Sequence, residues 1–239
     1  MLQERSYWDE RFVTENEYDW FGDYAMFRGE LAPHIPSKQA RILVLGCGTS
    51  TLSADLYRDG FLDVTSTDYS PVVIEKMQQR HPELKWRVMD ATQTFDFPCG
   101  HFDVVIEKGL VDVFMDGVKD QWHLEASKRA QMAAVCSEVA RVMRPRGAVF
   151  LSITFSPPHF RKQLYARSRF GWSVNARRCE GASAGAIEYY VYRMRRGEPL
   201  SEADAALERG HDEHERGGAD AAAVLVELEE NDILNIDID

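Results

Sequence analysis

Glycine and acidic residues stand where successive apolar runs of the sequence end. Gly46 and Gly48 follow the first run. Asp68 follows the second run and Asp90 the third. Glycines let the backbone turn tightly and approach a ligand closely. A carboxylate about 20 residues after such a turn can accept hydrogen bonds from ribose hydroxyls, and Asp68 lies 20 residues after Gly48. The pattern therefore predicts a site for an adenosine-containing cofactor.

Two neighbours of these acids add contacts that an adenine base needs. Tyr69 follows Asp68 and offers an aromatic face, while Ala91 follows Asp90 and offers a backbone N–H. The carboxylate of Asp90 is suited to accept a hydrogen bond from the adenine amino group. Acids at strand ends also cap helices, and a glycine turn alone also occurs in ordinary strand–helix loops. Their joint occurrence at successive strand ends favours the cofactor site.

Position 51 separates two classes of cofactor. Dinucleotide-binding folds use the pattern G-x-G-x-x-G, whose third glycine lets the helix pack beside a pyrophosphate. Thr51 occupies that position, and the sequence has no Tyr-x-x-x-Lys proton relay. S-adenosylmethionine carries no phosphates and needs no such cradle. The sequence thus predicts S-adenosyl-L-methionine as the cofactor and S-adenosyl-L-homocysteine as its product.

The apolar runs alternate with segments of helical pattern, which predicts parallel βαβ units. Strands are expected at residues 41–45, 63–67, 85–89, 102–107 and 148–154, and helices at residues 51–59, 71–80 and 123–143. Two further strands are expected at residues 172–179 and 187–195, joined by a turn at residues 181–185. The predicted fold is an α/β Rossmann-like doubly wound sheet of seven strands, mostly parallel, with a C-terminal antiparallel hairpin. Such sheets bind ligands at the carboxyl ends of their strands.

The negative charge of the chain is confined to its C-terminal end. Residues 201–239 hold 13 acidic residues and two arginines, which accounts for the whole formal net charge of −11. We therefore expect one domain at residues 1–197 and an acidic, partly disordered tail at residues 198–239, with a mobile linker at residues 210–223. Two hypotheses for the tail stay open. It is a solvated terminus, or it attracts a basic protein substrate.

Composition indicates a globular protein of the cytoplasm. Hydrophobic residues make up 44% and charged residues 28% of the sequence, which is ordinary for a globular domain. No apolar run reaches the roughly 18 residues of a membrane helix, and the first residues do not resemble a signal peptide. The cysteines are Cys47, Cys99, Cys136 and Cys179, without a CxxC pair. We therefore expect reduced thiols and no metal site.

The motifs, taken in order, resemble those of a known enzyme family. The strings VLGCGTS, TSTDYS, VMDA and FDVVIEKG follow the motif order of class I, seven-stranded S-adenosylmethionine-dependent methyltransferases. The strings YWDERF, YDWFGDY, PHFR and FGWS resemble the lysine methyltransferases of elongation factor 1-alpha, over about residues 7–197. The resemblance implies a protein-lysine N-methyltransferase whose partner is elongation factor 1-alpha, with no direct contact to nucleic acid or membrane. YDWFG and EKG are more specific than the glycine turn.

The resemblance also implies roles for individual residues. Trp8, Phe12 and Trp20 are expected to form an aromatic lid over the cofactor within residues 1–36, although they would also suit an N-terminal helix packed on the sheet. The family has tyrosine where Phe12 stands, so a hydroxyl contact is absent. Lys108 of EKG is expected to reach the methionine carboxylate of the cofactor. The other contacts implied are those of Gly46, Asp68, Tyr69, Asp90 and Ala91, and the glycine turn adds Gly48.

Methyl transfer from a sulfonium needs an aligned nucleophile and exclusion of water more than acid–base catalysis. The target lysine must be neutral, and burial beside the cationic sulfonium lowers its pKa. Glu107, Asp112 and His159 are weaker catalytic candidates. Each also has a structural interpretation, as a strand end, a helix cap and a loop histidine, so no general base is assigned. The residues Leu110 and Val111 stand where the family implies a Thr-Leu pair, which leaves the substrate contacts open.

Two other functions stay open at this point. One is methyl transfer to a different acceptor, either a small molecule or another protein. The other is a catalytically silent module that keeps the fold and binds a partner. A monomer is the expected state of the chain in each case, and binding of S-adenosylmethionine separates the enzymes from a silent module that has lost cofactor affinity.

Overall fold

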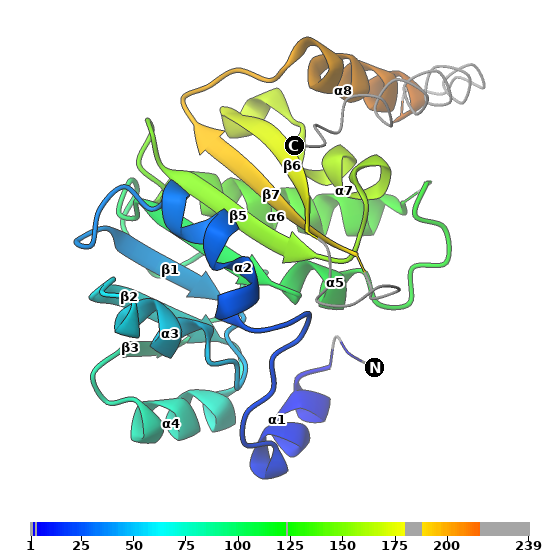
Figure 1. Ribbon diagram of the computed structural model, residues 1–239. Coiled ribbons are helices and arrows are strands. Elements are labelled where there is room, and N and C mark those ends of the chain that lie inside the picture. The colour runs from blue at the N-terminus through cyan, green and yellow to red at the C-terminus, as the bar shows by residue number, and fades with distance from the viewer. Residues whose placement is uncertain (1, 3, 123, 180–187, 216–239) are drawn as a thin grey trace.

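Seven strands form one sheet in the computed structural model, which describes residues 2, 4–122, 124–179 and 188–215. The strand order is β3-β2-β1-β4-β5-β7-β6 (Figure 1). The bounds are β1 Arg41–Leu45, β2 Asp63–Asp68, β3 Lys85–Val88, β4 Val104–Lys108, β5 Val149–Thr154, β6 Trp172–Cys179 and β7 Tyr189–Arg196. Strands β1 to β5 pair in parallel, whereas β7 pairs antiparallel with β5 and β6. This confirms the predicted fold class. The turn expected at residues 181–185 lies outside the described residues.

Helices cover both faces of the sheet (Figure 1). Their bounds are α1 Arg5–Thr14, α2 Tyr24–Leu31, α3 Leu52–Arg58, α4 Pro71–Arg80, α5 Leu110–Phe114, α6 Ala126–Val142, α7 Pro158–Tyr165 and α8 Glu202–Glu215. Single 3₁₀ turns span Ala32–His34 and Ser168–Phe170. Helices α1 to α4 pack on one face and α5 to α7 on the other. Helices α3, α4 and α6 correspond to the three that the sequence predicts.

Strand β1 shows how the sheet separates two hydrophobic cores. Ile42 and Val44 pack with α1 to α4, whereas Leu43 and Leu45 pack with α5 to α7. All four side chains are at most 2% exposed. Successive side chains of a strand point to opposite faces, so a strand covered on both faces needs an apolar residue at every position. This explains why the central strands read as uninterrupted apolar runs.

The strand order brings the carboxyl ends of β1, β2 and β4 side by side. Leu45 pairs in register with Thr67 of β2 and with Glu107 of β4. The chain passes from β1 to β2 and β3 on one side and then returns to β4 on the other side, so the strand order reverses between β1 and β4. Doubly wound sheets bind their ligands at this reversal. The residues that follow these three strands therefore converge at one edge.

Helix α8 lies within the segment that the sequence predicts to be an acidic tail. Its Asp204 is 2% exposed and pairs with Lys162 of α7, with 3.1 Å between Oδ1 and Nζ. Glu208 accepts hydrogen bonds from the backbone N–H and the hydroxyl of Ser168 at 2.9 and 3.1 Å. Helix α8 continues through residues 210–215, where the sequence predicts a mobile linker. Residues 216–239 lie outside the described residues.

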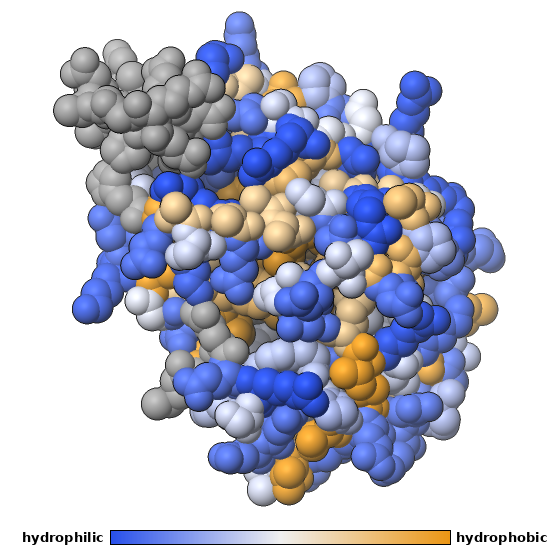
Figure 2. All heavy atoms as spheres, turned by 180° about the vertical axis from the view of Figure 1, so that it is seen from behind, coloured by the Kyte–Doolittle hydropathy of each residue, from blue (hydrophilic) through white to orange (hydrophobic). Residues whose placement is uncertain are grey.

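Hydrophobic side chains reach the surface in scattered groups among hydrophilic ones on the face seen in Figure 2. Such a distribution is usual for globular proteins. None of the helices in the described ranges has the length and hydropathy of a membrane span. Within the same ranges, no three His, Cys, Asp or Glu side chains are grouped so that they could hold a metal ion.

Candidate active site

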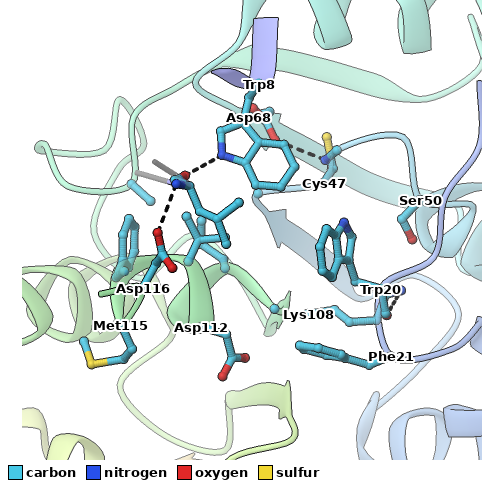
Figure 3. A pocket seen from close by; sticks show the side chains of 18 of the residues that line it. Trp8, Trp20, Phe21, Cys47, Ser50, Asp68, Lys108, Asp112, Met115 and Asp116 are labelled. Atoms are coloured by element: carbon cyan, nitrogen blue, oxygen red, sulfur yellow. Dashed lines mark hydrogen bonds between the residues drawn. The ribbon is translucent and has the colours of Figure 1, made fainter. Parts of the chain in front are cut away.

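A cavity of about 360 Å³ opens at the carboxyl ends of β1, β2 and β4. This volume falls in the range of small-molecule sites, roughly 300–1,000 Å³. Figure 3 shows that Trp8 and Trp20 project toward the same space, with Lys108 and Phe21 beside Trp20. The lining includes all the residues that the sequence predicts as cofactor contacts: Trp8, Phe12, Trp20, Gly46, Gly48, Asp68, Tyr69, Asp90, Ala91 and Lys108.

The glycine turn after β1 has a backbone geometry that favours glycine. Gly46 and Gly48 have φ angles of 61° and 48°, in the left-handed region. A Cβ on Gly46 would lie 2.8 Å from Cδ1 of Leu110. The N–H of Gly48 donates to Oδ2 of Asp68 at 3.1 Å, and the N–H of Ser70 donates to its Oδ1 at 3.0 Å. One buried carboxylate thus ties the turns after β1 and β2 together.

The residues after β2 and β3 present polar atoms suited to an adenosine. Asp68 is 6% exposed, and burial raises the pKa of its carboxyl to about 6. The hydroxyl of Tyr69 is buried and has no hydrogen-bond partner among the described residues. Asp90 accepts hydrogen bonds through Oδ1 from the N–H and hydroxyl of Thr92, at 2.8 and 2.7 Å. Carboxylate oxygens accept more than one hydrogen bond, so both acids can also take donors from a ligand.

Aromatic side chains from the N-terminal segment form one wall of the cavity. Trp8 stacks on Phe12 with 5.4 Å between ring centroids and meets Trp20 edge-on at 6.2 Å. The Phe12 ring lies 3.7 Å from the position of a Cβ on Gly48. The Arg11 guanidinium lies over the rings of Trp8 and Trp20, 5.5 and 5.1 Å from their centroids. Helix α1 therefore contributes to the cavity as well as to the core.

Lys108 fastens this N-terminal segment to the end of β4. Its Nζ lies 2.8 Å from Oδ1 of Asp19, 2.8 Å from the carbonyl oxygen of Trp20 and 2.9 Å from that of Gly22. An ammonium group has three N–H donors, so these acceptors use all of them. Burial lowers the pKa of Lys108, and Asp19 opposes that change. The contact between Lys108 and the methionine carboxylate of the cofactor stays a prediction. The observed geometry supports a different role for Lys108, as a clamp that holds the N-terminal segment against the end of β4.

Phe21 completes the joint between the YDWFG and EKG motifs. It has a φ angle of 67° and is the only non-glycine residue in the described ranges with positive φ. Its Cε2 lies 3.1 Å from the position of a Cβ on Gly109, whose own φ is 80°. A side chain at position 109 would displace the Phe21 ring. The two motifs therefore depend on each other. The YDWFG segment supplies the Phe21 ring and the acceptors for the lysine, and EKG supplies Lys108 and, at Gly109, the space for the ring.

Asp112 and Arg161 form an ion pair on the β4–β5 side of the cavity. Nη2 of Arg161 lies 2.5 Å from Oδ1 of Asp112, which also accepts from the Thr154 hydroxyl at 2.7 Å. The side chains are 3% and 10% exposed for Arg161 and Asp112. Burial raises the pKa of Asp112, and Arg161 opposes that change. Nε and Nη1 of Arg161 and Oδ2 of Asp112 have no hydrogen-bond partner in the described part of the chain.

The other two catalytic candidates, Glu107 and His159, are not among the residues that line the cavity. Glu107 is 1% exposed and accepts hydrogen bonds from the Ser152 hydroxyl and, at 3.2 Å, from the N–H of Val111. Burial raises its pKa to about 7. His159 is exposed on α7 and stacks on Trp122, with 5.3 Å between ring centroids. The structure thus brings only Asp112 of the three to the cavity.

Replacing Glu107 with glutamine should increase stability at pH 8. The folded-state pKa of about 7 lies above the ordinary glutamate pKa of 4.5, so ionisation of the buried carboxyl destabilises the fold as the pH rises through this interval. The shift corresponds to about 3 kcal/mol at pH 8, and the gain should fall toward zero near pH 4.5. Urea unfolding of Glu107→Gln and wild type between pH 4.5 and 8 measures the difference. Glu138→Gln is the control, because Arg141 lowers the pKa of Glu138 and its loss should destabilise without this slope. A constant difference between Glu107→Gln and wild type would contradict the assignment.

Several lining residues were missed by the sequence interpretation. Phe21 was inside a recognised motif, YDWFG, whose neighbouring Trp20 alone was assigned a role. Arg161 ends the PHFR motif, in which His159 alone was assigned a role, and Phe155 carries no local signal, since an aromatic residue after a strand is common. Their place in the lining follows from the packing of α7 beside the end of β5. The additional lining residues that bear on function are Phe21, Leu110, Met115, Gln121, Phe155, Ser156 and Arg161.

The sequence matches known methyltransferases over most of its length. EEF1A lysine methyltransferase 4 of Mus musculus is 44% identical over 207 residues, which cover 84% of this chain and 78% of that protein. The protein of that name from Bos taurus is 39% identical over 211 residues, which cover 86% and 80%. The chain belongs to the EEF1A lysine methyltransferase 4 family. The eEF1A lysine and N-terminal methyltransferase of Homo sapiens is 30% identical over 189 residues, which cover 76% of this chain and 26% of that protein.

Domain and fold comparisons agree with this membership. The family described as "Methyltransferase domain" matches residues 42–147. The N-methyltransferase NodS from Bradyrhizobium japonicum, in complex with S-adenosyl-L-homocysteine, superposes with a TM-score of 0.59 at 16% identity, covering 83% of this chain and all of that one. The chain is an S-adenosylmethionine-dependent methyltransferase. The residues present fit that cofactor, because two acids and the buried Tyr69 hydroxyl, which has no partner in the described part of the chain, line a cavity whose glycine turn has no room for a side chain at Gly46.

Proposed function

We propose that the enzyme transfers methyl groups from S-adenosylmethionine to the ε-amino group of a lysine in elongation factor 1-alpha. Two relatives that are 44% and 39% identical are named for this activity. The cavity supports an acceptor besides the cofactor, because its lining continues past the adenosine residues to Asp112, Phe155 and Arg161. The observation that carries the proposal is this identity to lysine methyltransferases, extended over 84% of the chain.

We propose cofactor-holding roles that suit the position of each residue in the cavity lining. When bound, S-adenosylmethionine supplies a methyl group that a lysine amine takes by in-line displacement, while the C–S electron pair stays on sulfur. We assign the ribose to Asp68, the adenine to Asp90 together with Tyr69 and Ala91, and close backbone approach to Gly46. The stacked rings of Trp8 and Phe12, which α1 contributes to the cavity wall, exclude water from the site. Nucleophilic displacement requires this exclusion together with alignment of the nucleophile. Lys108 keeps that wall in place.

The acceptor lysine must arrive at the cofactor as a neutral amine. Its free pKa is about 10.4, and burial among apolar groups disfavours the ammonium form. Trp20, Phe21 and Phe155 supply such an environment, with 5.5 Å between the ring centroids of Phe21 and Phe155. A cation–π contact of roughly 0.5–2 kcal/mol also stabilises the ammonium at entry. The amine proton can leave to solvent before the lysine is fully enclosed, so the reaction needs no dedicated base.

We also propose that the enzyme acts as a monomer in the cytoplasm. The four thiols are unpaired in the structure, and Cys47 and Cys136 are buried, as suits a reducing compartment. We further propose that the methyltransferase domain ends near residue 198. Helix α8 follows this boundary and packs against α7 as an extension of the domain.

The function is tested with purified elongation factor 1-alpha made in bacteria and cofactor labelled with a deuterated methyl group. We expect labelled methyl-lysine at a defined position by mass spectrometry, and none with the Asp68→Asn variant. Label only on other proteins of a lysate would identify a different acceptor. Cofactor binding without transfer to any acceptor, or no binding by calorimetry, would favour a silent module instead.

A further inference from the structure

Asp112 lines the side of the cavity that the adenosine residues leave free, and its buried Oδ2 has no hydrogen-bond partner among the described residues. We infer that Asp112 receives the ε-amino group of the target lysine, and that Arg161 and Thr154 hold its carboxylate in position. The inference rests on the proposed lysine methylation and names the group that recognises the acceptor nitrogen. Figure 3 shows the Asp112 side chain on the same side of the cavity as Lys108 and Phe21.

The two oxygens of the Asp112 carboxylate have very different surroundings. Oδ1 accepts from the Thr154 hydroxyl at 2.7 Å and from Nη2 of Arg161 at 2.5 Å. Oδ2 is buried, the side chain is 10% exposed, and no described residue donates to this oxygen. Buried charged oxygens without a donor are strongly unfavourable. A carboxylate accepts hydrogen bonds and donates none, so the fitting ligand group is an N–H or O–H donor, and a cation fits best.

No neighbouring basic residue of the described chain satisfies this oxygen. Lys108 spends its three N–H groups on Asp19, Trp20 and Gly22. Arg161 contacts the other oxygen through Nη2, and its Nε and Nη1 reach no acceptor among the described residues. The buried group therefore holds two acids, Glu107 and Asp112, against one guanidinium, so it has no surplus positive charge to repel an incoming ammonium.

The strand order places Asp112 where an acceptor must stand. Asp68 and Asp90 follow β2 and β3, on one side of β1, whereas Asp112 lies in α5 directly after β4 on the other side. A cofactor whose adenosine is held at β2 and β3 therefore extends its reactive end toward β4. The cavity lining at this end includes Phe21 and Phe155, whose rings suit the methylene chain of a lysine.

The contact orients the nitrogen in both of its protonation states. An ammonium donates one of three N–H groups to Oδ2, and a neutral amine donates one of two, which leaves its lone pair free for the methyl carbon. Because Arg161 pairs with the same carboxylate, it weakens the attraction of Asp112 for the ammonium form of the lysine. Asp112 is thus suited to bind the lysine and to align its nitrogen with the methyl carbon. Alignment of the reacting atoms accelerates methyl transfer.

The test compares Asp112→Asn with wild type on elongation factor 1-alpha whose target lysine is intact or replaced by methionine. With S-adenosylhomocysteine present, wild type should bind the lysine form at least about 10-fold more tightly than the methionine form, and Asp112→Asn should lose that preference. Its kcat/KM should fall roughly 100-fold, while affinity for S-adenosylhomocysteine stays within about threefold, since no cofactor contact is removed. Asp103→Asn is the matched control, because Asp103 is a buried acid paired with Arg144 at the far end of β4.

Three outcomes would overturn the inference. One is an unchanged kcat/KM in Asp112→Asn, the second is a lysine preference that survives the substitution, and the third is a wild type that binds lysine and methionine forms equally. The third outcome needs no variant to fold. Thr154→Val gives a second reading, because it keeps the carboxylate but removes one of its supports, and we expect a smaller fall in kcat/KM. If wild type leaves elongation factor 1-alpha unmodified, the proposed function fails instead.

Discussion

Replacing Lys108 with methionine should lower the methylation rate at least about 100-fold and leave the sheet folded. The Lys108 side chain is 4% exposed, and its ammonium joins β4 to Asp19 and two backbone carbonyls of the N-terminal segment. Removing one partner of a buried ion pair typically costs about 3–5 kcal/mol. If that energy holds the segment closed, the closed population falls by roughly two orders of magnitude or more. The cavity wall that Trp20 and Phe21 form would then open to water.

Hydrogen exchange and rate measurements check this prediction together. The amides of residues 5–22 should exchange faster in Lys108→Met, whereas those of β1, β4 and β5 should keep their protection. Lys85→Met is the control, because Lys85 pairs with Asp63 at 2.7 Å but the side chains are 63% and 35% exposed, and such surface pairs contribute about 0–1 kcal/mol. Equal rates in Lys108→Met and wild type would show that the clamp is dispensable.

A double-mutant cycle with Asp19→Asn tests whether the ion pair itself carries the effect. Asp19 also accepts hydrogen bonds from Ser50 and Thr51, so its loss has a cost that Lys108 does not share. The double variant should nevertheless be much less impaired than the product of the two single effects, because the second substitution removes an interaction already lost. If the effect of the double variant instead equals the product of the two single effects, the role of Lys108 rests on its contacts with the carbonyl oxygens of Trp20 and Gly22 alone.

The central strands, and the position of the expected cofactor contacts around one cavity, were predictable because local rules govern both. Strand β1 is buried on two faces, which requires the unbroken apolar run that the sequence displays. Helix α4 begins at Pro71 as predicted, since Ser70 caps it by accepting from the N–H of Val73. Asp68 and Asp90 follow strand ends, and parallel strands bring those ends to one edge. Each inference used only residues close together in the sequence.

The remainder of the site depends on contacts between distant residues. Lys108 meets acceptors 86 to 89 positions away, and the sequence offered two motifs without indicating that they touch. Arg161 lies 49 positions after Asp112, and their pairing follows from how α7 packs on the sheet. Helices α5 and α7 have five and eight residues, too few to show a helical period clearly. Such short helices form through tertiary packing rather than propensity.

Affinity for S-adenosylhomocysteine should fall about 10-fold between pH 7 and pH 5 in wild type. Burial raises the pKa of Asp68 to about 6 in the cofactor-free fold. Ribose hydroxyls donate to its ionised form, so ligand binding lowers that pKa. Affinity is therefore nearly constant above pH 7 and declines as the acid gains its proton below pH 6. Calorimetric titrations at pH 5, 6, 7 and 8 measure the decline directly.

Asp68→Asn should bind S-adenosylhomocysteine at least about 100-fold more weakly at pH 7.5, with little change in affinity down to pH 5. Two hydrogen bonds to a charged group contribute roughly 1.5–3 kcal/mol each, and asparagine does not titrate in this range. Gly48 and Ser70 donate to different oxygens of Asp68, so asparagine keeps an acceptor for only one of these two N–H groups, and the loss of the other adds to the fall in affinity. Asp90→Asn is the matched control, since it should weaken binding yet retain the wild-type decline below pH 6. Tight binding by Asp68→Asn, or the same decline in both variants, would move the ribose contact to another residue.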